Sequence, residues 1–238
     1  MEKTAEGELL KEDASNYDSS AYKKPSVTVD IIICSIIDKE LKVLLIKRKN
    51  PLYSNHWAIP GGFVDIDKNE NLEKTVEREL LEETNISGIY FEQLKTYGEP
   101  DRDPRMRIIS VAYFVLVPIE KITSEIKAGS DAKETQWFPL RNLPEQLAFD
   151  HQQILKDTLE RILNKISYTP IAFSFLQTNF TWSDLKLVYE TILMKKMNDG
   201  NFRRKINSQY KISKSVGVKT GVGRPAHYLN FNGIKEKF

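Results

Sequence analysis

Apolar runs alternate with polar stretches along the first part of the chain and predict both strands and helices. Residues 27–37 are rich in β-branched side chains and predict a strand, and residues 41–46 predict a second strand after a short polar turn, so the two should form a hairpin. Apolar side chains that recur at helical spacing predict helices over residues 70–83 and 151–166. The other strands expected here are residues 108–117 and 136–139.

The C-terminal part of the chain predicts a helix, a tight turn and a second, basic helix. Thr181 and Asp184 have the spacing of a capping box, and apolar residues recur at helical spacing from Leu185 to Leu193. Gly200-Asn201 then separates this helix from a short basic helix over residues 202–206.

A hairpin is expected to complete this part. Residues 210–213 and 227–231 are strand candidates, and the loop between them, residues 214–225, is rich in Gly, Lys and Arg. Helix, turn, basic helix and hairpin follow one another in the order of a winged helix-turn-helix.

The charge of the chain is divided unevenly between its two ends. Of the 35 basic and 33 acidic residues, 12 basic and 4 acidic residues lie in residues 171–238, which leaves 23 basic and 29 acidic residues in residues 1–170. The basic part suits a polyanion, although a merely solubilising basic domain is the alternative. We therefore expect a polar, mobile tail over residues 1–22, one domain over residues 23–166 and a second domain over residues 167–238.

The sequence carries no sign of export or membrane insertion. Its one cysteine, Cys34, lies in an apolar run, so no intrachain disulfide can form and a buried, unreactive thiol is expected. No apolar run reaches the roughly 18 residues of a membrane helix, and the N-terminus lacks the basic start and apolar core of a signal peptide. These features favour a reducing, cytoplasmic setting without a membrane partner.

Three carboxylates share one face of the helix predicted over residues 70–83. Residues three and four apart lie on the same helical face, so Glu79, Glu82 and Glu83 converge, with Arg78 beside them. Their mutual repulsion costs stability unless a cation compensates it, and Mg²⁺ prefers carboxylate oxygens. The alternative is a solvated acidic face of the helix.

The pattern Gly62…Glu70…Arg78-Glu79-Leu80-Leu81-Glu82-Glu83…Ile86 resembles the Nudix box, including the spacing between Glu70 and Arg78. This resemblance implies an α+β fold, the Nudix α/β/α sandwich with a mixed sheet. It also implies that divalent metal, Mg²⁺ being the expected ion, is held by Glu70, Glu79, Glu82 and Glu83. Of these, Glu79 or Glu82 would lie closest to the role of catalytic base.

One departure from the box bears on catalysis. Seven residues separate Gly62 from Glu70, more than in the family. The longer loop, residues 65–69, can displace the glycine backbone from the carboxylates, and a misplacement of about 1 Å can cost ~10²-fold in rate. The insertion therefore favours loss of hydrolysis over its retention, while binding would survive.

A run of arginines precedes the strand predicted at residues 108–117. Arg102, Arg105 and Arg107 can bind phosphate or stack on a base, the alternative being a proline-fixed, salt-bridged loop. The run resembles the DRDPR-x-R-x-x-S-V-A-Y segment of ADP-ribose-type Nudix domains and of related regulators. By that resemblance it faces the ligand pocket.

Other positions complete the expected ligand site. Gly61 and Gly62 allow the backbone to approach a ligand closely, and Arg48 ends the second predicted strand. His151 closes the run Ala148-Phe149-Asp150-His151, which also resembles those relatives, and we expect this histidine to be structural or capping rather than catalytic.

The basic helix and the loop after it carry the residues expected to contact DNA. A recognition helix places its N-terminal side chains on base edges in the major groove, where Arg bonds guanine, while Lys more often serves phosphate. Phe202 and Ile206 would bury the opposite face of this helix. The expected DNA-binding residues of the helix and wing are Asn201, Arg203, Arg204, Lys205, Lys214, Lys219 and Arg224.

Together with the Nudix box, the C-terminal residues resemble the Nudix-related transcriptional regulators of the NrtR type, over roughly residues 26–232. The matching runs are Phe180-Thr181, Val188-Tyr189-Glu190, Asn201-Phe202-Arg203-Arg204-Lys205 and Gly223-Arg224-Pro225-Ala226. The resemblance implies a homodimer that binds palindromic operators in double-stranded DNA near genes of NAD or sugar metabolism. It also implies a Nudix domain that senses ADP-ribose or a related nucleotide.

Two functions remain open from the sequence. The first is a ligand-responsive transcriptional repressor of genes of NAD or related metabolism, which the basic excess and residues 201–205 favour. The alternative is a Mg²⁺-dependent Nudix pyrophosphatase acting on ADP-ribose, which Glu79, Glu82 and Glu83 favour. Formation of AMP from ADP-ribose would distinguish them.

Overall fold

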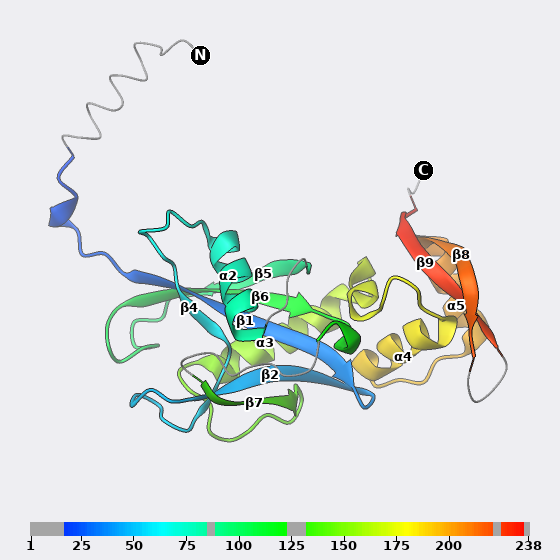
Figure 1. The fold of residues 1–238 in the computed structure, drawn as a ribbon, viewed down its shortest axis with the longest axis horizontal. Coiled ribbons are helices and arrows are strands. Elements are labelled where there is room, and N and C mark those ends of the chain that lie inside the picture. Colours follow the sequence, from blue (N-terminus) through cyan, green and yellow to red (C-terminus); the bar gives the residue numbers. More distant parts are fainter. Residues whose placement is uncertain (1–16, 85–88, 123–131, 221–224, 236–238) are drawn as a thin grey trace, which may run out of the picture.

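A mixed β-sheet forms the centre of the N-terminal domain (Figure 1). The central strand β1 (Ser26–Ile37) pairs in parallel with β6 (Ile108–Leu116) and antiparallel with β2 (Glu40–Arg48). The other strands of this sheet are β3 (Trp57–Ala58), β4 (Gly61–Phe63), β5 (Phe91–Tyr97) and β7 (Ala132–Pro139). The computed structural model describes residues 17–84, 89–122, 132–220 and 225–235.

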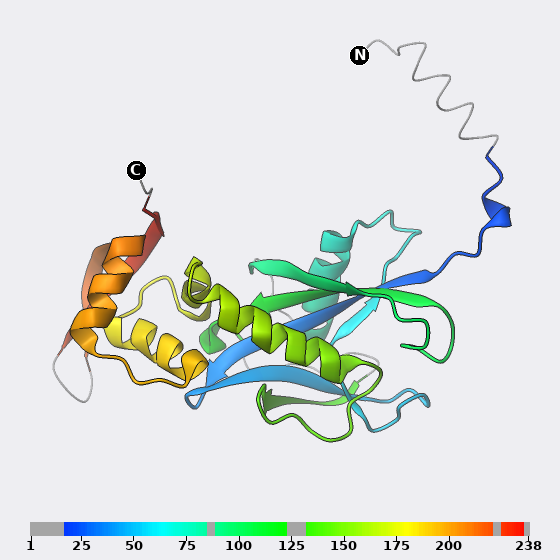
Figure 2. The ribbon, with the colours of Figure 1, turned by 180° about the vertical axis from the view of Figure 1, so that it is seen from behind.

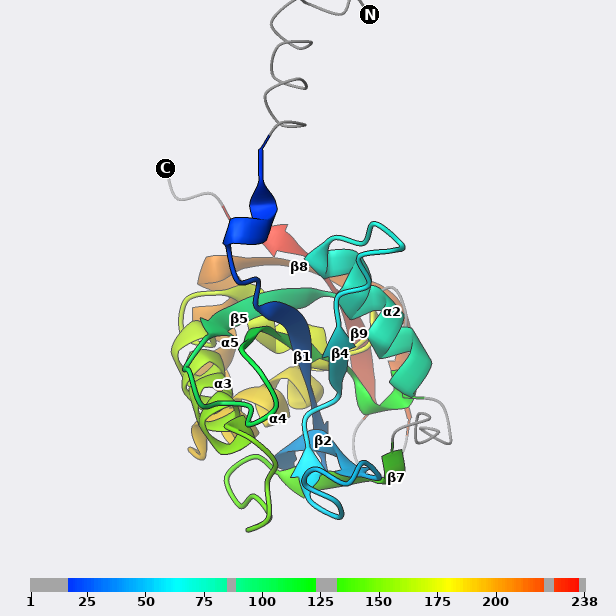
Figure 3. The same ribbon diagram turned by 90° about the vertical axis from the view of Figure 1, so that its left-hand side faces the viewer.

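Two helices cover opposite faces of this sheet, α2 (Leu72–Thr84) and α3 (His151–Lys165), as Figures 2 and 3 show. Side chains of a strand alternate between faces, so Ile31 and Ile33 of β1 belong to the core beneath α2, whereas Ile32 belongs to the core beneath α3. The expected α/β/α sandwich with a mixed sheet is confirmed. Short 3₁₀ helices lie at Ser19–Ala21 (η1) and Ile119–Lys121 (η2).

The C-terminal domain has the expected winged-helix order. The capping box is present, because Thr181 Oγ1 accepts from the backbone N–H of Asp184 and the Asp184 carboxylate accepts from the backbone N–H of Thr181. Its elements are η3 (Pro170–Phe175), α4 (Trp182–Leu193), α5 (Asp199–Gln209), β8 (Tyr210–Lys219) and β9 (Ala226–Ile234). None of the helices in the described part of the chain has the length and apolarity needed to cross a bilayer.

Two local expectations were wrong in detail, and one strand was missed. The basic helix α5 begins at Asp199 rather than at residue 202, because the Asn198 side chain accepts from the backbone N–H of Asn201 and caps the helix earlier, so Gly200-Asn201 lies inside it. Strand β8 continues to Lys219, where a loop was expected from residue 214. Strand β5 was not predicted.

The core beneath α3 continues without a break into the C-terminal domain. Ile162 and Ile166 belong to the same cluster as Leu185 and Ile192 of α4. The Arg141 guanidinium, which follows β7, also donates to the carbonyl oxygen of Ile192 at 3.0 Å. This carbonyl lies at the C-terminus of α4, where a cation is favourable. The two domains of one chain are therefore packed together and are not separated by a free linker.

Buried charges tie the central strand to the loop before β6 and to the start of α3. The Arg102 guanidinium donates to Asp150 at 2.9 and 2.7 Å and lies 3.4 Å from Asp30 Oδ2. Ser110 Oγ also donates to Asp30, and His151 Nε2 lies 3.8 Å from the other oxygen of Asp30. With its side chain 5% exposed, Arg102 is a buried cation that depends on these carboxylates.

We expect both domains to unfold in one transition, because they share one core. Trp182 reports on the C-terminal domain, whereas Trp57 and Trp137 report on the sheet. The two variants are Trp182→Phe and the double variant Trp57→Phe/Trp137→Phe. In each of them, the midpoint of urea unfolding measured by tryptophan fluorescence should equal the midpoint measured by far-ultraviolet circular dichroism. Fluorescence midpoints that stay apart after correction for any change in overall stability would show that the domains unfold independently.

Loss of the buried guanidinium should strongly destabilise the N-terminal domain. Arg102→Ala leaves Asp30 and Asp150 buried without their cation, so the free energy of unfolding should fall by about 3–5 kcal/mol in urea denaturation. The matched control is Arg107→Ala, an exposed arginine of the same loop, which should change it by less than about 0.5 kcal/mol. Equal effects of the two variants would contradict the role given to the buried ion pairs.

Candidate functional site

A cavity of about 140 Å³ opens beside β1 and β4 in the N-terminal domain. The glycines of β4 form one wall at close range: a Cβ on Gly61 would lie 2.1 Å from the carbonyl oxygen of Val29. Because no side chain fits there, β4 can lie directly against β1. The charged and aromatic residues that line the cavity are Asp30, Arg48, Phe63, Arg102, Asp103, Arg105, Phe149 and His151.

The floor of the cavity is the buried charge cluster around Arg102. His151 Nδ1 accepts from the backbone N–H of Ile59 at 2.9 Å, which directs its other nitrogen toward Asp30. Burial lowers the pKa of His151 below its ordinary value, so the ring is neutral near pH 7. The histidine thus has the structural place that was expected of it, and Arg102 is bonded to carboxylates of the protein.

Two other arginines lie over aromatic rings of the same cavity. The Arg48 guanidinium is 4.9 Å from the centre of the Phe149 ring. The Arg105 guanidinium is 5.8 Å from the same ring and 5.9 Å from that of Phe63. Arg105 also donates to the Asp103 carboxylate at 2.7 and 3.0 Å. Arg107, the third arginine of this run, is exposed and is not among the residues that line the cavity.

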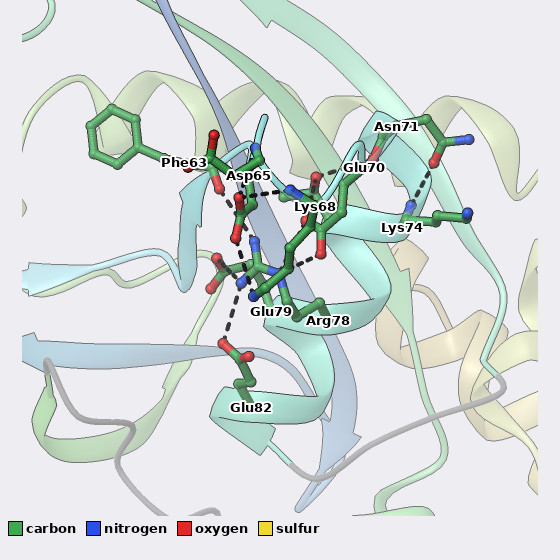
Figure 4. A network of polar contacts seen from close by, with 11 residues as sticks. Phe63, Asp65, Lys68, Glu70, Asn71, Lys74, Arg78, Glu79 and Glu82 are labelled. Carbon is green, nitrogen blue, oxygen red and sulfur yellow. Dashed lines mark hydrogen bonds and ion pairs between the residues drawn. The ribbon is translucent and has the colours of Figure 1, made fainter.

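Arg78 lies at the centre of the Nudix-box carboxylates (Figure 4). Its Nε donates to both oxygens of Glu70 at 2.9 and 3.1 Å, and its Nη1 donates to Glu79 at 2.8 Å and to Glu82 at 3.2 Å. Its Nη2 donates to the carbonyl oxygen of Phe63 at 3.3 Å, which ties α2 to β4. Hydrogen bonds from Arg78 lower the pKa of Glu70, whereas burial raises the pKa of Glu79.

The insertion before Glu70 does not separate the glycines from the carboxylates, contrary to expectation. A Cβ on Gly62 would lie 2.1 Å from Glu79 Oε1, so the glycine backbone rests directly on this carboxylate. The extra residues turn outward because Asp65 Oδ1 accepts from the backbone N–H groups of Asp67 and Lys68. Ile66, at 87% exposure, shows that this turn projects into solvent.

The carboxylate oxygens of this site suit a hard divalent cation by their chemistry. Glu70 is engaged with Arg78 through both oxygens, so Glu79 and Glu82 are the described residues that fit such an ion best. The side chain of Glu83 lies outside the described part, and among the described side chains no three potential metal ligands converge. Arg78 supplies the positive charge that the carboxylate repulsion requires.

The C-terminal domain presents a helix with one buried and one basic face. Phe202 and Ile206 of α5 are buried in the core, as expected. The polar residues expected to read DNA are all exposed on this helix, namely Asn201, Arg203, Arg204 and Lys205. The Arg203 guanidinium lies 5.6 Å from the centre of the Trp182 ring of α4. This contact holds the side chain near the start of α4.

The residues expected to contact DNA from the wing, the hairpin of β8 and β9, differ in their contacts. Lys214 is exposed on β8. Lys219 instead donates to Asp184 Oδ1 at 2.9 Å, which fastens the wing to the first turn of α4. Arg224 lies outside the described residues.

Two residues of the cavity, Asp30 and Phe63, were missed from the sequence, whereas Phe149 lies in the run 148–151 that resembled the relatives. Asp30 had a usable signal, because an acidic residue within an otherwise apolar strand requires a buried partner. Phe63 had no usable signal, since an aromatic residue in such a context is more often part of the core.

Comparison with known proteins agrees with this geometry. Residues 27–158 match the NUDIX domain, and residues 172–231 match the NrtR DNA-binding winged helix domain. The ADPR responsive transcriptional repressor NtrR of Acinetobacter baylyi is 34% identical over 218 residues, 91% of this chain and 86% of the relative. The ADP-ribose pyrophosphatase of Methanocaldococcus jannaschii is 44% identical over 149 residues, 63% of this chain and 80% of the relative.

Solved structures extend the similarity to both domains. Shewanella oneidensis NrtR complexed with a 27mer DNA is 33% identical, with a TM-score of 0.76 over 87% of this chain and 93% of that chain. The NUDIX domain of the same protein complexed with ADP ribose is 36% identical, with a TM-score of 0.57 over 64% of this chain and 97% of that chain. The chain therefore belongs to the NrtR family of transcriptional regulators, in which a Nudix domain is joined to a winged helix DNA-binding domain.

Proposed function

We propose that this protein is a transcriptional repressor that binds operator DNA through α5 and releases it when the Nudix domain binds ADP-ribose. The observation that carries the proposal is the basic, exposed face of α5, whose opposite face is held in the core by Phe202 and Ile206. A helix held in this way can enter the major groove without losing its own packing. The Acinetobacter relative is named an ADPR responsive repressor, and the Shewanella relative was solved with DNA and, as its NUDIX domain, with ADP ribose.

The DNA is a palindromic operator read by a homodimer, in keeping with the family resemblance and with the symmetry of such sites. Asn201, Arg203 and Arg204 face base edges, while Lys205 and Lys214 contact phosphate. Lys219 would have to leave Asp184 to reach DNA. Arg224, which follows β8 in the sequence, is a further candidate for DNA contact. The controlled genes belong to NAD or related metabolism, and the setting is the cytoplasm.

ADP-ribose occupies the cavity beside β4 in this proposal. The backbone of Gly61 and Gly62 allows the diphosphate to approach closely, and Arg48 supplies a cationic group beside it. Arg102 holds the floor through Asp30 and Asp150. If ADP-ribose binds more tightly to a form that binds DNA poorly, DNA must weaken ADP-ribose binding by the same factor.

A second candidate function is hydrolysis of ADP-ribose, favoured by the contact of Gly62 with Glu79 despite the inserted loop. The Methanocaldococcus relative is named a pyrophosphatase. Water would add to one phosphorus, the bond to the bridging oxygen would break, and AMP and ribose 5-phosphate would leave. Mg²⁺ held by Glu79 and Glu82, with Glu83 beside them in the sequence, would neutralise phosphate charge and lower the pKa of a bound water.

The proposal that α5 binds operator DNA is tested by removing two of its arginines. Arg203→Ala/Arg204→Ala should reduce affinity for a duplex selected by the wild type from a random pool to the level of unrelated DNA, because base contacts and phosphate charge are both lost. Fluorescence anisotropy measures this affinity, and calorimetry should show unchanged ADP-ribose binding. The control Lys121→Ala/Lys156→Ala removes two exposed charges from the Nudix domain and should leave DNA affinity unchanged. Retained selectivity in the arginine variant would refute the assignment of α5.

Hydrolysis is tested by incubating the protein with ADP-ribose and Mg²⁺ and measuring AMP. If the enzyme function holds, AMP should form only with Mg²⁺, and Glu82→Gln should abolish it while ADP-ribose binding persists. The control Glu77→Gln, an exposed residue of the same helix without a place in the carboxylate cluster, should retain the activity. Binding without AMP in the wild type would remove this second function and leave the repressor proposal intact.

A further inference from the structure

The cavity beside β4 is smaller than the sites that usually hold ligands of the size proposed. Its volume of about 140 Å³ compares with ~300–1,000 Å³ for typical small-molecule sites. A whole nucleoside diphosphate therefore fits inside the cavity only if a side chain that now lines it moves away.

Arg105 is a lining cation that can move more readily than Arg102. Its side chain is 42% exposed, and its ion pair is with Asp103, two residues away in the same loop. Arg102, by contrast, is 5% exposed and bonded to carboxylates of β1 and of the residue before α3. When the Arg105 side chain moves, the buried Asp103 carboxylate keeps the backbone N–H of Arg105 as a donor at 3.0 Å. Movement of Arg102 would instead leave Asp30 and Asp150 without their cation.

The guanidinium of Arg105 lies over two aromatic rings from separate segments. Phe63 ends β4, and its ring points away from the Arg78 network (Figure 4); Phe149 precedes α3. Neither is an ordinary core residue: Phe63 is 45% exposed, and Phe149 has a left-handed backbone with φ of 52°. Such a conformation is strained for a bulky residue and is characteristic of binding sites.

A guanidinium is flat and stacks on aromatic faces, as a nucleobase does. On the basis of the proposed function, we propose that Arg105 occupies the place of the ligand's base in the free protein. The base displaces Arg105 and stacks on Phe63 and Phe149. Arg105 thereby lowers the affinity for ADP-ribose, because only the fraction of molecules in which it has swung out can bind.

The direction in which one substitution changes the affinity for ADP-ribose tests this proposal. Arg105→Ala should bind ADP-ribose more tightly, by roughly tenfold if the two cation–π contacts keep the free site closed. Ribose 5-phosphate, which lacks a base, should bind the wild type and the variant equally. Isothermal titration calorimetry measures both, and Arg107→Ala is the matched control with no expected change. Weaker ADP-ribose binding in Arg105→Ala would show that Arg105 is a ligand contact and would overturn the proposal.

The aromatic walls give a second, independent measurement. Phe63→Leu and Phe149→Leu should each weaken ADP-ribose binding roughly tenfold, because each variant removes one of the two rings on which the base stacks. Binding of ribose 5-phosphate should not change. Phe63 is exposed enough for its variant to fold normally, which thermal unfolding would check. If the wild type binds ADP-ribose and both phenylalanine variants bind it with the same affinity, this inference is overturned and the proposed function stands. Absence of ADP-ribose binding in the wild type and in Arg105→Ala alike overturns the proposed function, and the inference with it.

Discussion

The ion pairs of the buried Arg102 guanidinium are the interaction on which the N-terminal domain most depends. One side chain joins the loop before β6 to Asp30 in β1 and to Asp150 in front of α3, so three segments far apart in the sequence meet at one point. Such a cluster adds little net stability compared with apolar packing, but it is costly to break and therefore specifies one arrangement. The strained backbone of Phe149 persists because its neighbour Asp150 is held in this way.

Much of the fold could be predicted because its signals are local. The β1–β2 hairpin follows from two apolar runs around a polar turn, and the capping box at Thr181 fixes the start of α4. Strand β5 gave no such signal, because it lies at the edge of the sheet and Phe91–Tyr97 buries only Leu94 and Tyr97. The other residues of this strand follow no regular apolar pattern. The early start of α5 depends on a single capping side chain, Asn198, and one contact of this kind outweighs the ~1 kcal/mol cost of a helical glycine.

The candidate site could be predicted as a set of residues but not as an arrangement. Arg102, Arg105 and Arg107 look alike in the sequence, yet one is buried in ion pairs, one lies over aromatic rings and one points to solvent. The deciding partners of Arg102 are Asp30 and Asp150, 72 and 48 residues away, and no local pattern shows that they meet. The same holds for Lys219, whose partner Asp184 lies 35 residues earlier.

The path between ligand and DNA follows from how the domains are joined. Residues 141–151 connect the C-terminal domain with the cavity. At the start of this segment, Arg141 donates a hydrogen bond to the end of α4, and at its end Phe149 and His151 line the cavity. Because the core beneath α3 continues into α4, the C-terminal domain cannot swing freely on a linker. A ligand that shifts this segment must therefore move packed elements together, and in a dimer a small rotation of each chain changes the spacing of two α5 helices. Coupling of this kind needs only two packings of nearly equal free energy that the ligand and the DNA stabilise to different extents.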